Sequence, residues 1–88
     1  MNFKEICDDI AEILEKKNMR YGESFRQTYY EYGGISICLR LEDKLNRLKN
    51  IVKDFDSSVH SATDTLLDIA GYAILALSVI GEVDGRSE

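Results

Sequence analysis

Proline is absent from this sequence of 88 residues, and cysteine and histidine are scarce. A chain without proline has no residue that forces a helix to stop, so its long periodic runs favour helices. Cys7 and Cys38 share no metal-ligand spacing with each other or with His60, which argues against a zinc site. Both cysteines fall within predicted helices, and we expect them to be reduced core thiols of a cytosolic protein.

Basic residues are fewer than acidic ones, with 11 Lys and Arg against 16 Asp and Glu and a net charge of −5. This balance argues against binding of DNA or RNA duplexes, which needs a basic face that displaces counterions. A local basic pocket for one small anion remains compatible with it. The first nine residues lack the apolar stretch of a signal peptide, and the longest apolar run, 69–80, is too short to span a bilayer. We therefore expect a cytoplasmic location and no membrane partner.

The length is enough for a single domain spanning 1–88, with a core at about 2–80 and a frayed tail at 81–88. The composition, 44% hydrophobic and 31% charged, is that of an ordinary globular protein. A chain of this size buries only about 60–65% of its unfolded surface, so its core is thin. We expect a homo-oligomer for this reason.

Apolar residues recur at spacings of three and four in three stretches, which predicts three long helices. These stretches are 2–18, 35–55 and 62–80. Asn2 is the expected N-cap of the first, and Ser24 that of a short helix running to about residue 31. His60 falls in a polar connection, where we expect it to be exposed to solvent. The helix at 62–80 is apolar nearly all round, so it should be central and most buried. The sequence thus predicts an all-α fold, a small antiparallel helical bundle completed by oligomerisation.

Asp64, Asp68 and Tyr72 follow one another at intervals of four, so they share one face of the helix that most needs burial. Asp64 is close to the helix N-terminus, where its charge can interact with the helix dipole. Asp68 lies in mid-helix, where a carboxylate is costly unless it is paired, hydrogen-bonded or metal-bound. It therefore predicts a partner across the bundle: a basic residue, a metal or a ligand.

Arg40, Lys44 and Arg47 form a basic row on one face of the preceding helix. If the two helices pack antiparallel, this row can face Asp64 and Asp68. One interpretation is a solvated flank with weak intrahelical ion pairs. The other is an anion pocket, in which arginine forks and a lysine charge bind phosphate.

Four of the five tyrosines lie in the segment 21–32. Such a segment can offer rings that stack on a flat base, with Tyr21, Phe25 and Tyr29 as candidates. It can equally form a hydrophobic latch that closes a small bundle.

Three stretches in register resemble the nucleotide modification associated domain 1 family, found largely in bacteriophage genomes. They are YGESF at 21–25, RLEDKLNRL at 40–48 and DTLLDIAGYAIL at 64–75. The resemblance covers about 15–77 and implies an all-α domain that acts in nucleotide metabolism or recognition. Its helical plan is similar to that of the nucleoside triphosphate pyrophosphohydrolases of the MazG and dimeric dUTPase type. Those enzymes hold magnesium with an E-x-x-E pattern followed by an E-x-x-D pattern.

The sequence departs from this metal-binding pattern in ways that affect the chemistry. Asp64 and Asp68 fall where the second pair would be, at a spacing of four. Members of the family often carry a Glu shortly before these aspartates, and residues 60–63 contain no carboxylate. The first pair would begin with Glu42 and Asp43, which are followed by a lysine and an arginine. Basic residues neutralise phosphate without a metal but give little means of activating water.

The residues therefore favour a nucleotide-binding protein that needs no cofactor over a hydrolase. Together with the small size of the chain, the resemblance implies a phage-type protein in the host cytoplasm that sequesters a nucleotide or cyclic oligonucleotide signal, an anti-defence sponge. In an alternative reading the protein is a magnesium-dependent nucleoside triphosphate pyrophosphohydrolase. Its metal ligands would be Glu42, Asp43, Asp64 and Asp68. In a second alternative the acidic first helix mimics nucleic acid and inhibits a host protein. The acidic residues concerned are Asp8, Asp9, Glu12 and Glu15.

Overall fold

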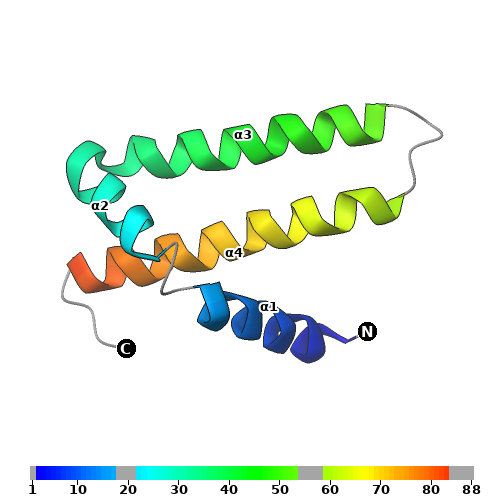
Figure 1. Cartoon of the computed structure of the whole chain (residues 1–88), viewed down its shortest axis with the longest axis horizontal. Helices are drawn as coiled ribbons and strands as arrows, with labels where there is room; N and C mark the ends of the chain where they lie inside the picture. The colour runs from blue at the N-terminus through cyan, green and yellow to red at the C-terminus, as the bar shows by residue number, and fades with distance from the viewer. Residues whose placement is uncertain (1, 18–21, 54–58, 84–88) are drawn as a thin grey trace.

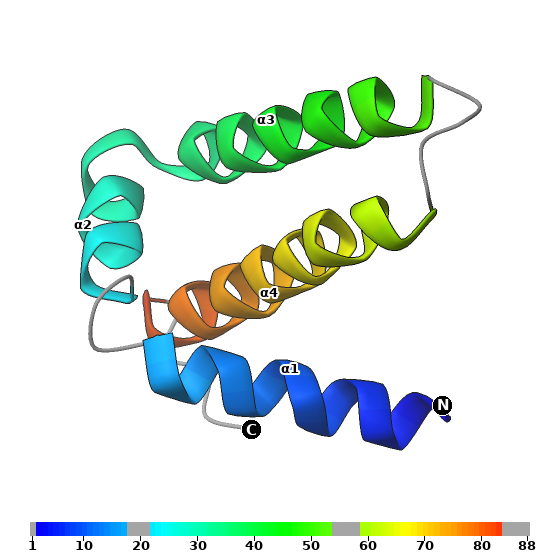
Figure 2. The ribbon, with the colours of Figure 1, turned by 45° about the vertical axis from the view of Figure 1, so that its right-hand side comes forward.

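The computed structural model describes residues 2–17, 22–53 and 59–83, which form four α-helices and no strand. The helices are α1 (Phe3–Lys17), α2 (Glu23–Tyr32), α3 (Gly34–Lys53) and α4 (Val59–Val83). α3 and α4 run antiparallel, α1 lies along another side of α4, and α2 closes one end (Figures 1 and 2). Because α4 contacts each of the other three helices, the predictions of an all-α fold and of a central last helix are confirmed.

Local sequence signals account for two of the helix boundaries. The side-chain oxygen of Asn2 accepts a hydrogen bond from the Glu5 amide at 2.8 Å, so Asn2 caps α1 as predicted. Gly33 has a φ of 74° and separates α2 from α3, a backbone conformation that glycine adopts without strain. The prediction of Ser24 as an N-cap is wrong, because α2 already begins at Glu23.

The last helix is longer at both ends than the sequence pattern indicated. α4 begins at Val59, so His60 lies in a helix and not in a connecting loop. It ends at Val83, so residues 81–83 are helical and not part of a frayed tail. Its 21-residue stretch Ala62–Glu82 is long and apolar enough, by length and composition, to cross a membrane, although core helices of soluble proteins satisfy the same criterion. The apolar run at 69–80, which by itself is too short to span a bilayer, therefore belongs to a longer helix.

The core is small and lies at the end of the bundle that α2 closes. Phe25 from α2 is 2% exposed and packs with Ala76 and Val79 of α4. Tyr29 and Tyr72 are partly buried against this cluster. The packing agrees with the hydrophobic-latch interpretation of the aromatic segment.

The prediction that both cysteines are core thiols is wrong, because Cys7 and Cys38 are exposed. α1 contacts α4 through its second half, so its first turns, with Phe3 88% exposed, extend past the contact. Cys38 and Leu45 are seven residues apart, so they lie on the same side of α3. Leu45 is 45% exposed, and no described helix covers this side.

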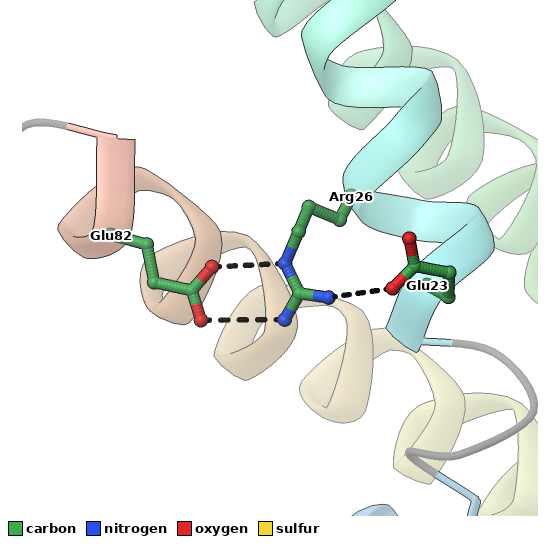
Figure 3. Close-up of polar contacts among 3 residues, drawn as sticks. All are labelled: Glu23, Arg26 and Glu82. Carbon is green, nitrogen blue, oxygen red and sulfur yellow. Dashed lines mark hydrogen bonds and ion pairs between the residues drawn. The ribbon is translucent and has the colours of Figure 1, made fainter.

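One arginine ties α2 to the end of α4 (Figure 3). Arg26 donates from Nε to Glu82 Oε2 at 2.9 Å and from Nη2 to Glu82 Oε1 at 3.3 Å, and its Nη1 reaches Glu23 at 3.2 Å. The hydrogen bond that Arg26 donates to Glu82 raises the pKa of Arg26 above its ordinary value. The fork-to-fork geometry fixes the orientation of α2.

Replacing Arg26 with Gln should lower the melting temperature slightly, and the decrease should shrink at high salt, because exposed ion pairs are weak and screened. Thermal unfolding followed by circular dichroism at low and high salt measures both effects. Lys16→Gln is the matched control, since it removes a pair with Glu12 that lies within α1 alone. An equal decrease in both variants would contradict a specific role for the α2–α4 tie.

Candidate functional site

A pocket of 550 Å³ opens between α1, α3 and α4. Its walls combine an apolar floor with charged groups of both signs. The lining residues are Ile10, Ile13, Leu14 and Lys17 of α1, Lys44 of α3, and Asp64, Leu67, Asp68, Gly71, Tyr72 and Leu75 of α4. α1 lies close to α4 at Gly71, because a Cβ at this position would be 3.4 Å from Leu14 Cδ2, at the edge of ordinary van der Waals contact.

The charged centre of the pocket is an ion pair across the antiparallel helices. Lys44 Nζ donates to Asp68 Oδ2 at 3.0 Å, and the side chains are 16% and 40% exposed. The ammonium also lies 6.0 Å from the ring centroid of Tyr72. Of the three partners that the sequence allowed for Asp68, the structure provides the basic residue.

The rest of the basic row does not enter the pocket. Arg40 lies over the rings of Phe25 and Tyr72, 5.0 and 6.0 Å from their centroids, and donates to Thr28 Oγ1 at 3.4 Å. It therefore braces α2 against α3 and α4. Arg47 is exposed and is absent from the pocket lining. It is three residues beyond Lys44, which turns it about 60° round the helix.

The aromatic candidates serve mainly the core. Phe25 is covered by Arg40 on α3 and by Tyr72, whose ring centroid lies 6.2 Å away at an interplanar angle of 20°. The expectation that Phe25 stacks on a base is corrected, because a ring that is 2% exposed offers it no free face. Tyr29 packs against the same core, and Tyr21 lies outside the described residues. Among the aromatic residues that the structure describes, Tyr72 lines the pocket.

The four candidate metal ligands are divided between two places. Asp64 and Asp68 line the pocket, whereas Glu42 and Asp43 are exposed on α3 and do not. Among the residues of the described ranges, no group of three or more His, Cys, Asp or Glu side chains could hold a metal ion. The donor set as folded therefore does not fit the four-carboxylate magnesium site.

The sequence analysis missed the contribution of α1. Lys17, Ile13 and Leu14 form one wall of the pocket, although the apolar spacing of α1 indicated packing alone.

The acidic face of α1 is partly neutralised by ion pairs within the helix itself. Lys4 pairs with Asp8 at 2.9 Å, and Lys16 pairs with Glu12 at 3.3 Å.

Comparison of the chain with family models, with curated proteins and with solved structures gave no match. The resemblance of residues 21–25, 40–48 and 64–75 to a nucleotide-related family therefore stays a prediction from the sequence.

Proposed function

We propose that this protein binds a nucleotide or a cyclic oligonucleotide in the pocket between α1, α3 and α4 and does not hydrolyse it. The observation that carries the proposal is the position of Lys44, a cation 16% exposed in the wall of a pocket with an apolar floor. A phosphate gains more from such a cation than from a solvated lysine, because less water screens the attraction.

The dimensions and lining of the pocket suit a nucleotide. Its 550 Å³ falls within the range of about 300–1,000 Å³ that is typical of small-molecule sites. Leu14, Leu67 and Leu75 offer apolar contact to a base. Tyr72 adds an aromatic side chain at the same wall, so a flat heterocycle can lie between α1 and α4.

The polar groups complement the remaining parts of such a ligand. The Lys44 ammonium has three N–H donors and gives one to Asp68, which leaves donors for phosphate oxygens. Lys17 supplies a second cation to the lining. Asp64 and Asp68 can accept hydrogen bonds from ribose hydroxyls or from an amino group of the base.

The same arrangement favours retention of the ligand over its turnover. Magnesium-dependent hydrolysis needs several carboxylates with open coordination positions and an activated water. Here Asp68 is already bonded to Lys44, and Glu42 and Asp43 lie outside the pocket. A protein that binds a nucleotide signal and leaves it intact lowers the free concentration of that signal. We therefore assign it the role of a sponge.

A second candidate function is supported by one specific observation. Asp64 and Asp68 both line the pocket, one helical turn apart. A magnesium-dependent pyrophosphohydrolase would place its second carboxylate pair here, but its first pair, Glu42 and Asp43, lies outside the pocket.

Ligand recovery tests the proposal directly. The purified protein is incubated with a mixture of nucleoside triphosphates and cyclic oligonucleotides, with magnesium or with EDTA, and then filtered. Heat denaturation releases the retained compounds for mass spectrometry. We expect one class of nucleotide to be recovered intact under both conditions. Monophosphate and pyrophosphate that appear only with magnesium would show a hydrolase, and retention of no compound would refute binding.

Replacing Asp68 with Ala should weaken binding several-fold in EDTA without abolishing it, because Lys44 keeps its charge but loses the partner that orients it. Glu42→Ala is the matched control and should leave binding unchanged. Equilibrium dialysis with the recovered nucleotide measures both variants. If the wild type hydrolyses nucleotide and both substitutions abolish turnover, the carboxylates are catalytic and the sponge assignment is wrong.

A further inference from the structure

One side of the central helix carries a row of apolar residues that no described helix covers. Leu66, Ile74 and Leu77 of α4 are 50%, 42% and 70% exposed. They are spaced by eight and three residues, so they lie along one side of the helix. Ala70 and Ala73 lie between them and complete an apolar stripe without a charged residue, here called the α4 stripe.

The α4 stripe faces away from the pocket. Asp68 and Tyr72, which meet α3, are roughly 200° and 240° round the helix from Leu66, at about 100° per residue. Gly71, which meets α1, is roughly 140° from Leu66 by the same rule. The contacts with α3 and α1 therefore occupy other sectors of α4, and this sector stays open.

The chain as a whole exposes more surface than a compact monomer of its mass. Its accessible surface is 6922 Å², whereas a folded monomer of 10.0 kDa exposes roughly 5,200 Å². Its radius of gyration is 14.4 Å, against about 12 Å expected for a compact chain of this length. This surplus of roughly 1,700 Å² belongs to the whole chain, and the α4 stripe is one of the exposed apolar surfaces that contribute to it.

We propose that two copies of this chain pair through the α4 stripe, with their α4 helices antiparallel about a twofold axis. In an isologous interface the same patch meets itself, and an uncharged stripe is self-complementary without any matching of charges. An axis near the middle of the stripe sets Leu66 of each copy opposite Leu77 of the other. The small side chains of Ala70 and Ala73 let the two backbones approach closely.

This inference goes beyond the proposed function and does not depend on the ligand. Pairing through the α4 stripe leaves both pockets open, because they lie in other sectors of α4. It also supplies the burial that the small core lacks, so stability should rise with protein concentration.

Analytical ultracentrifugation of the full chain tests the pairing. We expect the wild type to sediment as a dimer at micromolar concentration, with twice the 10.0 kDa mass of one chain. Leu77→Glu places two charges in the interface and should give a monomer with retained helicity. Leu39→Glu, at a site 59% exposed on α3, is the matched control and should remain a dimer. A wild type that stays monomeric, or a Leu39→Glu variant that dissociates as readily as Leu77→Glu, would overturn the proposal.

Cross-linking keeps the test decisive if Leu77→Glu fails to fold. Ala73→Cys in a Cys7→Ser, Cys38→Ser background should form a covalent dimer with a short bismaleimide, whereas Glu12→Cys in the same background should not. A covalent dimer from Glu12→Cys alone would place the interface on α1 and overturn the proposal. Binding of the wild type to phosphatidylcholine vesicles that Leu77→Glu abolishes would show that a bilayer covers the stripe, and would also overturn it.

Discussion

Replacing Phe25 with Ala is expected to remove a large part of the free energy of unfolding of this protein. A buried phenylalanine truncated to alanine costs about 3–5 kcal/mol, and a domain of this length has on the order of 4–13 kcal/mol in all. Phe25 is the one large side chain in the core cluster of buried residues, and the ring of Tyr72 and the guanidinium of Arg40 both pack on it. Its removal therefore disconnects α2 from α3 and α4 together. Urea denaturation followed by circular dichroism measures the loss.

Tyr30→Ala is the matched control, because it removes an aromatic ring from the same helix at a site 63% exposed. Its effect should stay within about 0.5 kcal/mol, as is usual for surface substitutions. Equal losses of stability in the two variants would contradict a core centred on Phe25. So would a Phe25→Ala variant as stable as the wild type.

Replacing Lys44 with Met should reduce nucleotide affinity by about 10- to 100-fold, because one charge-assisted hydrogen bond contributes about 1.5–3 kcal/mol. Methionine keeps a similar length of apolar stem and removes the charge. Asp68 is 40% exposed, so water can solvate the carboxylate once its partner is lost. Isothermal titration of the nucleotide recovered from the wild type measures the change in affinity.

Arg47→Met removes a cation from the same helix at an exposed position outside the pocket, and it should bind like the wild type. Each substitution removes one positive charge, so the comparison separates a pocket contact from general electrostatic attraction. Equal losses in the two variants would show that phosphate is bound by the outer face of α3. The pocket assignment would then be wrong.

Periodicity predicted the fold well, because the spacing of apolar residues depends on local helix geometry. It also indicated that the basic row can face Asp64 and Asp68 if the two helices pack antiparallel, and in the structure Lys44 pairs with Asp68. Periodicity could not distinguish Lys44, which lines the pocket, from Arg47, which is exposed. The two residues lie on one broad face of α3, and the position of the neighbouring helices decides which of them is buried. The burial of Phe25 depends on how α2 folds back over α4, a long-range contact without a local signature. For the same reason the α1 wall of the pocket could not be predicted.

A nuclear magnetic resonance titration tests most directly whether a nucleotide binds in the pocket between α1, α3 and α4. The ¹⁵N-labelled chain is titrated, in EDTA, with ATP, with a cyclic dinucleotide and with the compound recovered from the mixture. We expect saturable chemical-shift changes in the amide signals of the pocket-lining residues of α1 and α4 and of Lys44. The ligand should be intact after the titration. Shifts confined to Arg47 and the outer face of α3, or no shifts with any of the three compounds, would contradict binding in the pocket.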